Sequence, residues 1–151
     1  MAERDWLIVE AETVEEVMGA EALYDGPARR EWAERFLASP GHHLLLARAT
    51  DAEGPVGMAS GVQMTHPDKG TEMMLYELCV AESHRRRGIG RGLVDALGQL
   101  ARAHGCYGMW VPVDADNEAA LATYRSAGGR TEELCQVPVW DFAPAEEPSG
   151  A

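Results

Sequence analysis

The chain has 151 residues, of which 46% are hydrophobic and 25% are charged, and its formal net charge is −12. This length and composition predict one soluble globular domain, and no apolar run reaches the roughly eighteen residues that a membrane span requires. The acidic charge argues against nucleic acid as a partner, because affinity for phosphate backbones comes from basic surface.

The N-terminus and the cysteine pattern limit the compartment and the metal chemistry of the protein. The first residues are too polar for a signal peptide, so we expect a cytoplasmic protein. Cys79, Cys106 and Cys135 are widely spaced and lie near no histidine pair. They predict neither a disulfide framework nor a zinc site, and we expect no bound metal.

The first forty residues predict one strand and two helices. The short apolar run at 6–10 is typical of a strand. Thr13 and Glu16 form a capping box, in which the threonine accepts from a first-turn amide and the glutamate reaches back, so a helix is expected over 14–23. A second helix is expected over 27–38, with a proline in its first turn.

Three strands and a long helix are predicted next. Apolar segments bounded by turn residues indicate strands at 43–50, 56–65 and 73–80, and two glycines weaken the pattern of the middle one. A helix is expected over 88–104, because apolar residues recur on one face at helical spacing. Gly105 suits the end of this helix.

The C-terminal part predicts strands on either side of one helix. Residues 107–113 indicate a strand, and the proline within it is typical of an edge or a bulge. Asn117 is expected to cap a helix that reaches about Ala127. Residues 134–142 are expected to form a last strand or pair of strands.

The order of these elements, β-α-α-β-β-β-α-β-α-β, predicts an α/β fold with a mixed sheet and helices on its faces. We expect a single domain over 1–142. Residues 143–151 have no large apolar side chain and are interpreted as a disordered tail. Pro112 and Pro138 lie near expected sheet edges, where they would suit strands that pair across a homodimer.

A cationic glycine turn lies between the strand at 73–80 and the helix at 88–104. Glycine has no Cβ, so the backbone can approach a ligand closely, and the free N–H groups at the start of a helix point at phosphate oxygens. Arg85, Arg86 and Arg87 would oppose the helix dipole there unless an anion is bound. The turn therefore predicts a pyrophosphate site. The spacing of a Rossmann fingerprint and the G-K-[ST] of a Walker A loop are both absent.

Two stretches resemble one enzyme superfamily. Residues 85–90 are similar to the R/Q-x-x-G-x-G/A signature of the GNAT superfamily of acyl-CoA-dependent N-acetyltransferases, and residues 117–128 resemble its N-x-x-A-x-x-L-Y-x-x-x-G helix. The likeness covers about 43–142 and departs from the pattern at Thr123 and Gly129. It implies the GNAT fold, in which a twisted, mostly antiparallel sheet is flanked by about four helices and its splayed central strands bind acetyl-CoA.

Within the superfamily, residues 76–89 resemble the Y-D-L-A-V-x-x-x-H-R-R-x-G-I stretch of the small aminoglycoside 3-N-acetyltransferases. This resemblance implies direct acetyl transfer from acetyl-CoA to a primary amine, with an aminoglycoside antibiotic as the leading acceptor. Two alternatives remain open. The acceptor could be another small amine, a polyamine, or a protein lysine or N-terminus, or the chain could be a non-catalytic acyl-CoA-binding module.

Acetyl transfer to an amine needs one group to accept a proton from the amine and another to protonate the leaving thiolate. Glu77 is the candidate base and is expected to point away from Tyr76 and Leu78, while Asp114 is the alternative base or a substrate clamp. Tyr124 is the candidate acid, because a phenol with a pKa near its usual value of about 10 keeps its proton at pH 7. The resemblance implies that its hydroxyl lies near the thioester sulfur.

The resemblance also implies which residues contact each substrate. Backbone groups at 78–80 would pair with the pantetheine arm and polarise the thioester carbonyl. The expected acetyl-CoA contacts are Leu78, Cys79, Val80, Arg85, Arg86, Arg87, Gly88, Ile89, Gly90, Arg91, Asn117 and Tyr124. A small cationic acceptor is expected to contact acidic and aromatic residues at loop ends, namely Tyr24, Asp25, Glu77, Asp114 and Asp116.

Overall fold

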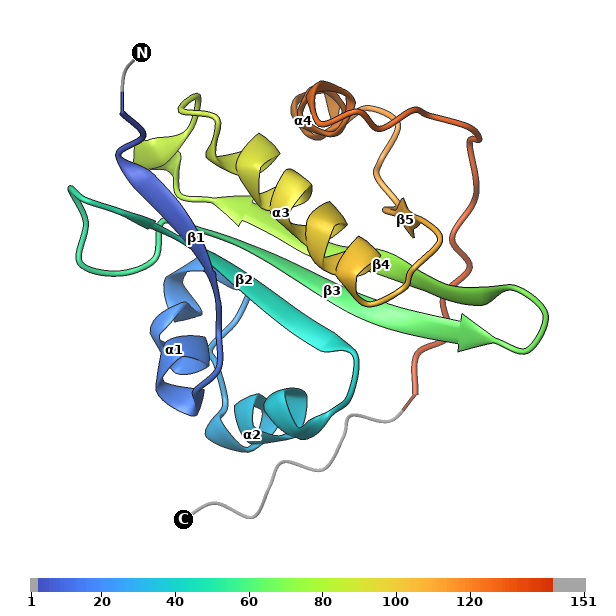
Figure 1. Ribbon diagram of the computed structural model, residues 1–151, viewed down its shortest axis with the longest axis horizontal. Helices are drawn as coiled ribbons and strands as arrows, with labels where there is room; N and C mark the ends of the chain where they lie inside the picture. Colours follow the sequence, from blue (N-terminus) through green and yellow to red (C-terminus); the bar gives the residue numbers. More distant parts are fainter. Residues whose placement is uncertain (1–2, 143–151) are drawn as a thin grey trace.

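The computed structural model describes residues 3–142, and within this range five strands form one sheet in the order β1-β2-β3-β4-β5 (Figure 1). The first four strands pair antiparallel, and β5 pairs in parallel with β4. The expected mixed, mostly antiparallel sheet is therefore confirmed. The strands are β1 (Trp6–Glu10), β2 (His42–Ala49), β3 (Gly57–His66), β4 (Gly70–Val80) and β5 (Met109–Trp110).

Helices cover both faces of this sheet. The helix α3 (Ile89–Ala103) packs on one face, and α1 (Val14–Gly19) and α2 (Arg30–Ala38) pack on the other (Figure 1). The fourth helix, α4 (Glu118–Ser126), contacts α3. This arrangement confirms the predicted α/β fold with four α-helices. None of the helices within the described range is long and apolar enough to cross a membrane.

The interior strand β2, between β1 and β3, explains why the sheet needs helices on both faces. Leu45 and Ala47 pack in the same core cluster as α3, whereas Leu44 and Leu46 pack in the cluster that contains residues of α1 and α2. A strand that is buried on both faces is continuously apolar rather than alternating. The apolar run of β2 is therefore the sequence signature of a two-sided core.

Two glycines of β3 allow α3 to approach the sheet. A Cβ at Gly61 would lie 2.9 Å from Leu97 Cδ1, and a Cβ at Gly57 would lie 3.1 Å from Leu93 Cδ1. Both leucines are fully buried. The glycines that weaken the strand pattern in the sequence thus have a packing role, because side chains there would push the helix away.

The first two helices differ from their predicted bounds. The capping box is present, since Thr13 Oγ1 accepts from the Glu16 amide at 3.1 Å and the Glu16 carboxylate reaches back to the Thr13 hydroxyl. The predicted helix over 14–23 is divided, because α1 ends at Gly19 and a short 3₁₀ helix, η1 (Glu21–Leu23), follows. The second helix begins at Arg30, three residues later than predicted. The Ala28 amide is instead bonded to the Glu21 carboxylate at 2.9 Å.

The C-terminal strands are where the prediction was wrong. Only Met109–Trp110 of the expected strand at 107–113 pairs with β4. Because β5 has only two residues, it offers few backbone groups for a further strand to pair with. Residues 134–142 form no strand beside it. Large apolar side chains there are exposed, namely Leu134, Val137, Val139, Trp140 and Phe142. The expected tail at 143–151 lies outside the described residues, and the homodimer stays a prediction.

Candidate functional site

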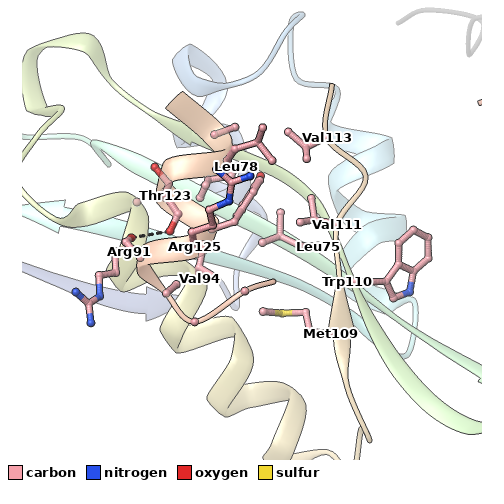
Figure 2. A pocket seen from close by; sticks show the side chains of 18 of the residues that line it. Leu75, Leu78, Arg91, Val94, Met109, Trp110, Val111, Val113, Thr123 and Arg125 are labelled. Atoms are coloured by element: carbon pink, nitrogen blue, oxygen red, sulfur yellow. Dashed lines mark hydrogen bonds between the residues drawn. The ribbon is translucent and has the colours of Figure 1, made fainter. Parts of the chain in front are cut away.

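An open cleft lies where β4 and β5 separate. The two strands pair only at Met73 with Met109 and at Met74 with Trp110. Beyond this point β4 continues to Val80, while residues 111–113 turn away from it. Figure 2 shows Leu75 and Leu78 facing the segment that carries Val111 and Val113. Side chains from β4, α3, α4 and this segment line the cleft.

The glycine turn forms one end of the cleft. Gly88 caps α3 with a left-handed φ of 80°, which glycine adopts without steric cost. Arg86 also has a positive φ, 63°, which is uncommon for a side-chain-bearing residue and is costly unless the surroundings hold it. The first N–H groups of α3 have no partner inside the helix, so they are available to an anion at this end.

The arginines of the turn are not equivalent. Arg85 and Arg86 are exposed and line the cleft, and the Arg85 Nε donates to the Val80 carbonyl at 3.1 Å. Arg87 is not among the lining residues, and its Nη1 lies 3.1 Å from Asp51 Oδ2 and 3.5 Å from Asp5 Oδ2. Arg91 lines the cleft and is 3.7 Å from Asp95. Arg85, Arg86 and Arg91 therefore supply exposed cations to the cleft at the start of α3, whereas Arg87 is paired with two aspartates outside the lining.

The structure brings almost all of the expected acetyl-CoA residues to this one cleft. Arg87 is the exception, and Ile89 is fully buried, so it can contribute only its backbone. The expected residues that line the cleft are Leu78, Cys79, Val80, Arg85, Arg86, Gly88, Ile89, Gly90, Arg91, Asn117 and Tyr124. Asn117 acts as the predicted cap of α4, because its Oδ1 accepts from the Ala120 amide at 3.1 Å.

A β-bulge turns the end of β4. Ser60 pairs with Glu77 and the adjacent Gly61 pairs with Leu75, so Tyr76 is an extra residue. A regular strand would point Glu77 away from Tyr76, as expected from the sequence. The bulge overturns this alternation, because Tyr76 lies near Phe36 of α2 and Glu77 also faces the α1 and α2 side.

Glu77 lies beside two of the expected acceptor residues. Burial and a hydrogen bond to Asp25 raise the pKa of Glu77. Burial, with a smaller contribution from the charge of Glu77, raises the pKa of Tyr24 to about 12. The Tyr24 hydroxyl donates to the Val17 carbonyl at 2.7 Å, which ties the loop before α2 to α1. Glu77, Asp25 and Tyr24 thus form an acidic cluster at the end of β4.

The remaining candidates lie on the cleft side. Tyr124 is half-buried, packs with the core cluster that includes Leu78 and Val80, and has a pKa raised by burial. Asp114 is exposed and lines the cleft, and its carbonyl accepts from the Asn117 amide. Asp116 is exposed and is not among the lining residues. Within residues 3–142, no group of three or more histidine, cysteine or acidic residues is placed to hold a metal ion.

Sequence reasoning missed the residues behind the glycine turn. His84 is buried, with 7% of its surface exposed, and its Nε2 lies 2.9 Å from Asp51 Oδ1. The Trp6 indole donates to the Arg87 carbonyl at 3.1 Å. These partners come from β1 and from the turn after β2, and no local pattern in the sequence could indicate that they meet.

Comparison with known families and proteins agrees with this geometry. The model of the acetyltransferase (GNAT) family matches residues 6–128. Mycothiol acetyltransferase of Clavibacter sepedonicus is 41% identical over 102 residues, which are 66% of this chain and 30% of that protein. The N-alpha-acetyltransferase RimI of Mycobacterium tuberculosis is 35% identical over 94 residues, which are 62% of this chain and 56% of that protein. The chain therefore spans only part of the length of these curated relatives.

Solved structures show the same fold. An aminoglycoside acetyltransferase from an uncultured soil metagenomic sample, in complex with sisomicin, has a TM-score of 0.83 and 17% identity, covering 92% of this chain and 97% of that one. The aminoglycoside N-acetyltransferase AAC(6')-Iy in complex with CoA has a TM-score of 0.72 and 19% identity, covering 91% and 94%. At these identities the likeness concerns the fold alone.

Proposed function

Since this chain belongs to the acetyltransferase (GNAT) family, we propose that it transfers the acetyl group of acetyl-CoA to a primary amine. The observation that carries this proposal is the cleft between the separating ends of β4 and β5, which has a left-handed Gly88 and exposed arginines at one end. A long, narrow ligand with an anionic end fits this arrangement better than a compact one.

The residues around the cleft fit acetyl-CoA in two ways. The amides at the start of α3, with Arg85 and Arg86, would hold the pyrophosphate. Residues 78–80 pair with β3 on one side, and in the described chain no strand pairs with their other side, which leaves backbone groups for the pantetheine arm. This pairing would place the thioester near the end of β4.

Glu77 and Tyr124 would supply the proton transfers. When the amine nitrogen attacks the thioester carbon, the C–S bond breaks, the nitrogen loses a proton and the thiolate gains one. A carboxylate with a raised pKa accepts a proton more readily, which suits Glu77 as the base. A phenol with a raised pKa is protonated at neutral pH, which suits Tyr124 as the acid.

The acceptor we propose is an aminoglycoside, modified at its 3-amino group. The support is the pair of carboxyl groups of Asp25 and Glu77, beside Tyr24, in a chain with a net charge of −12, since a polycationic ligand gains from both. A protein N-terminus is the second candidate. Two relatives at 35% identity are named N-alpha-acetyltransferase RimI and ribosomal protein bS18-alanine N-acetyltransferase. Other small amines and polyamines use the same chemistry.

Acetyl-CoA turnover with a panel of amines tests the proposal. CoA release would be measured with kanamycin, gentamicin, spermidine, a lysine peptide and a peptide with a free N-terminus. Highest kcat/KM with the aminoglycosides is expected. Preference for a peptide would show that the acceptor is a protein amine, and the proposed acetyltransferase activity would still hold. Tight binding of acetyl-CoA without turnover of any amine would favour an acyl-CoA-binding module.

A further inference from the structure

A buried histidine lies behind the arginine turn and takes no part in the chemistry proposed above. His84 is at the end of a short 3₁₀ helix, η2 (Glu82–His84), and its Nε2 lies 2.9 Å from Asp51 Oδ1. Because a carboxylate can only accept, this nitrogen carries the proton. The Nδ1 lies 2.7 Å from the Ser83 hydroxyl. Both nitrogens of this buried ring are therefore satisfied.

Asp51 also holds the other end of the turn. Its second oxygen, Oδ2, accepts from Arg87 Nη1 at 3.1 Å. The backbone of Arg87 is held as well, because its carbonyl accepts from the Trp6 indole at 3.1 Å. The hydrogen bonds from His84 and from Arg87 lower the pKa of Asp51, so its carboxylate stays charged. One carboxylate thus joins two residues that are three positions apart in the turn.

The two residues between these anchors are exposed and line the cleft. His84 also borders the cleft but is buried, and Arg87 is exposed but lies outside the lining. Arg86 has a φ of 63°, a conformation that persists only when its surroundings fix it. Because His84 and Arg87 are anchored on either side of the pair Arg85 and Arg86, the backbone of the turn is fixed around Arg86.

Asp51 also pairs with the one arginine of the turn that does not line the cleft. The guanidinium of Arg87 is balanced by Asp51 and by Asp5, 3.5 Å away. The adjacent Arg85 and Arg86 line the cleft together with Arg91. Without Asp51, Arg87 would lose one of its two carboxylates and His84 would keep a buried, unsatisfied N–H.

We propose that Asp51 is a positioning residue which, through His84 and Arg87, holds the arginine turn in the shape that binds the anionic end of the acyl donor. This role rests on the proposed function of the cleft. Asp51 itself need not touch the ligand. Loss of this carboxylate would also cost some folding stability at the buried His84, so CoA binding, rather than unfolding, is the property that reports the role.

The test compares Asp51→Asn with Glu53→Gln in the full chain. Both substitutions remove one negative charge from the same exposed turn, and Glu53 forms no hydrogen bond or ion pair with His84 or Arg87. Asp51→Asn is expected to raise the Kd of CoA, measured by calorimetry, and the KM of acetyl-CoA by about tenfold, as for one lost charge-assisted contact. The kcat with the best amine should change by less than about twofold. Glu53→Gln should change none of these.

Two further measurements separate positioning from a general structural effect. Asp51→Glu keeps the carboxylate and should recover part of the CoA affinity, and His84→Gln should weaken binding as Asp51→Asn does. Amide hydrogen exchange over 84–92 in the free protein should be faster in Asp51→Asn than in Glu53→Gln. If both the exchange and the CoA affinity of Asp51→Asn match the control, the positioning role is wrong. Failure of the wild type to bind CoA would instead overturn the proposed function. The exchange experiment uses the free protein, so it tests the positioning of the turn independently of CoA binding.

Discussion

The carboxyl groups of Glu77 and Asp25 are hydrogen bonded to each other, although one ends β4 and the other belongs to the loop before α2. Burial is the largest cause of the raised pKa of Glu77, and the hydrogen bond and the negative charge of Asp25 act in the same direction. The loop before α2 therefore adds to the basicity of the residue that we propose as the base.

Removal of the Asp25 charge should move the pH dependence of the enzyme. In Asp25→Asn the pKa of Glu77 should fall toward its ordinary value, because burial remains but the neighbouring charge is gone. The acidic limb of the kcat/KM profile is then expected at lower pH than in the wild type. Profiles of both proteins with the best amine give the comparison, and Asp68→Asn, in the turn after β3, is the charge control. An acidic limb at the same pH in both proteins would show that Asp25 does not affect the pKa of the catalytic base.

The same pair should affect stability in a pH-dependent way. The folded-state pKa of Glu77 is raised, so its contribution to stability is complete below its unfolded pKa and is lost as the pH rises through the folded value. Asp25→Asn should therefore stabilise the protein more at pH 7 than at pH 4, relative to the wild type. Thermal unfolding at the two pH values measures the difference. An equal shift in Tm at both would contradict the coupling.

Glu77→Gln should reduce turnover without weakening the binding of acetyl-CoA. Loss of a general base typically lowers the rate by about 10²-fold or more, and Glu77 is not among the residues that line the cleft. The measurements are kcat for the amine and Kd for CoA. Glu82→Gln, at an exposed position in η2, is the matched control. A kcat within about twofold of the wild type would transfer the role of base to another group, with Asp114 as the next candidate.

Tyr124→Phe should also act on kcat rather than on the affinity for CoA. Phenylalanine keeps the half-buried ring and removes only the hydroxyl that would protonate the thiolate, so a loss of about 10²-fold is expected. Tyr107→Phe is a suitable control, because the Tyr107 hydroxyl donates to Glu72 at 2.7 Å on the exposed surface. Were kcat to survive in Tyr124→Phe, the thiolate would have to gain its proton elsewhere.

Gly61→Ala should destabilise the fold by about 1–3 kcal/mol, the usual cost of overpacking a core. The new Cβ would lie 2.9 Å from both Leu97 Cδ1 and Met73 Sδ, and both side chains are fully buried. Urea unfolding measures the change in the free energy of unfolding. Gly54→Ala is the control, because nothing lies within 4 Å of its Cβ position. Equal stability of the two variants would show that α3 can move away from β3 at little cost.

Local patterns predicted most of the elements and the glycine turn at the start of α3. The Thr13 capping box, the Asn117 cap and the glycine start of α3 are each contained within four residues, and all three are present. The cleft residues of β4 and α3 lie close together in sequence, on either side of the glycine turn. Their neighbours in sequence determine these features, so no tertiary information was needed.

Features that depend on distant partners could not be predicted. The bulge at Tyr76 needs the register of β3 against β4, and it alone turns Glu77 to the side of Asp25. Of the predicted strand at 107–113, only Met109 and Trp110 pair with β4, and the predicted strand at 134–142 does not form. A sequence pattern does not reveal whether a neighbouring strand is available for pairing. A strand is stable only when a neighbour completes its backbone hydrogen bonds.

The sequence by itself determined an α/β chain with a cationic glycine turn at the start of a helix, because glycine conformation, arginine charge and helix capping act over a few residues. Only the tertiary structure decided which arginines line the cleft. Asp51 is far from the turn in sequence, yet it joins His84 and Arg87, while Arg85 and Arg86 line the cleft. A carboxylate can pair with a cation that is distant in sequence only after folding brings the two groups together.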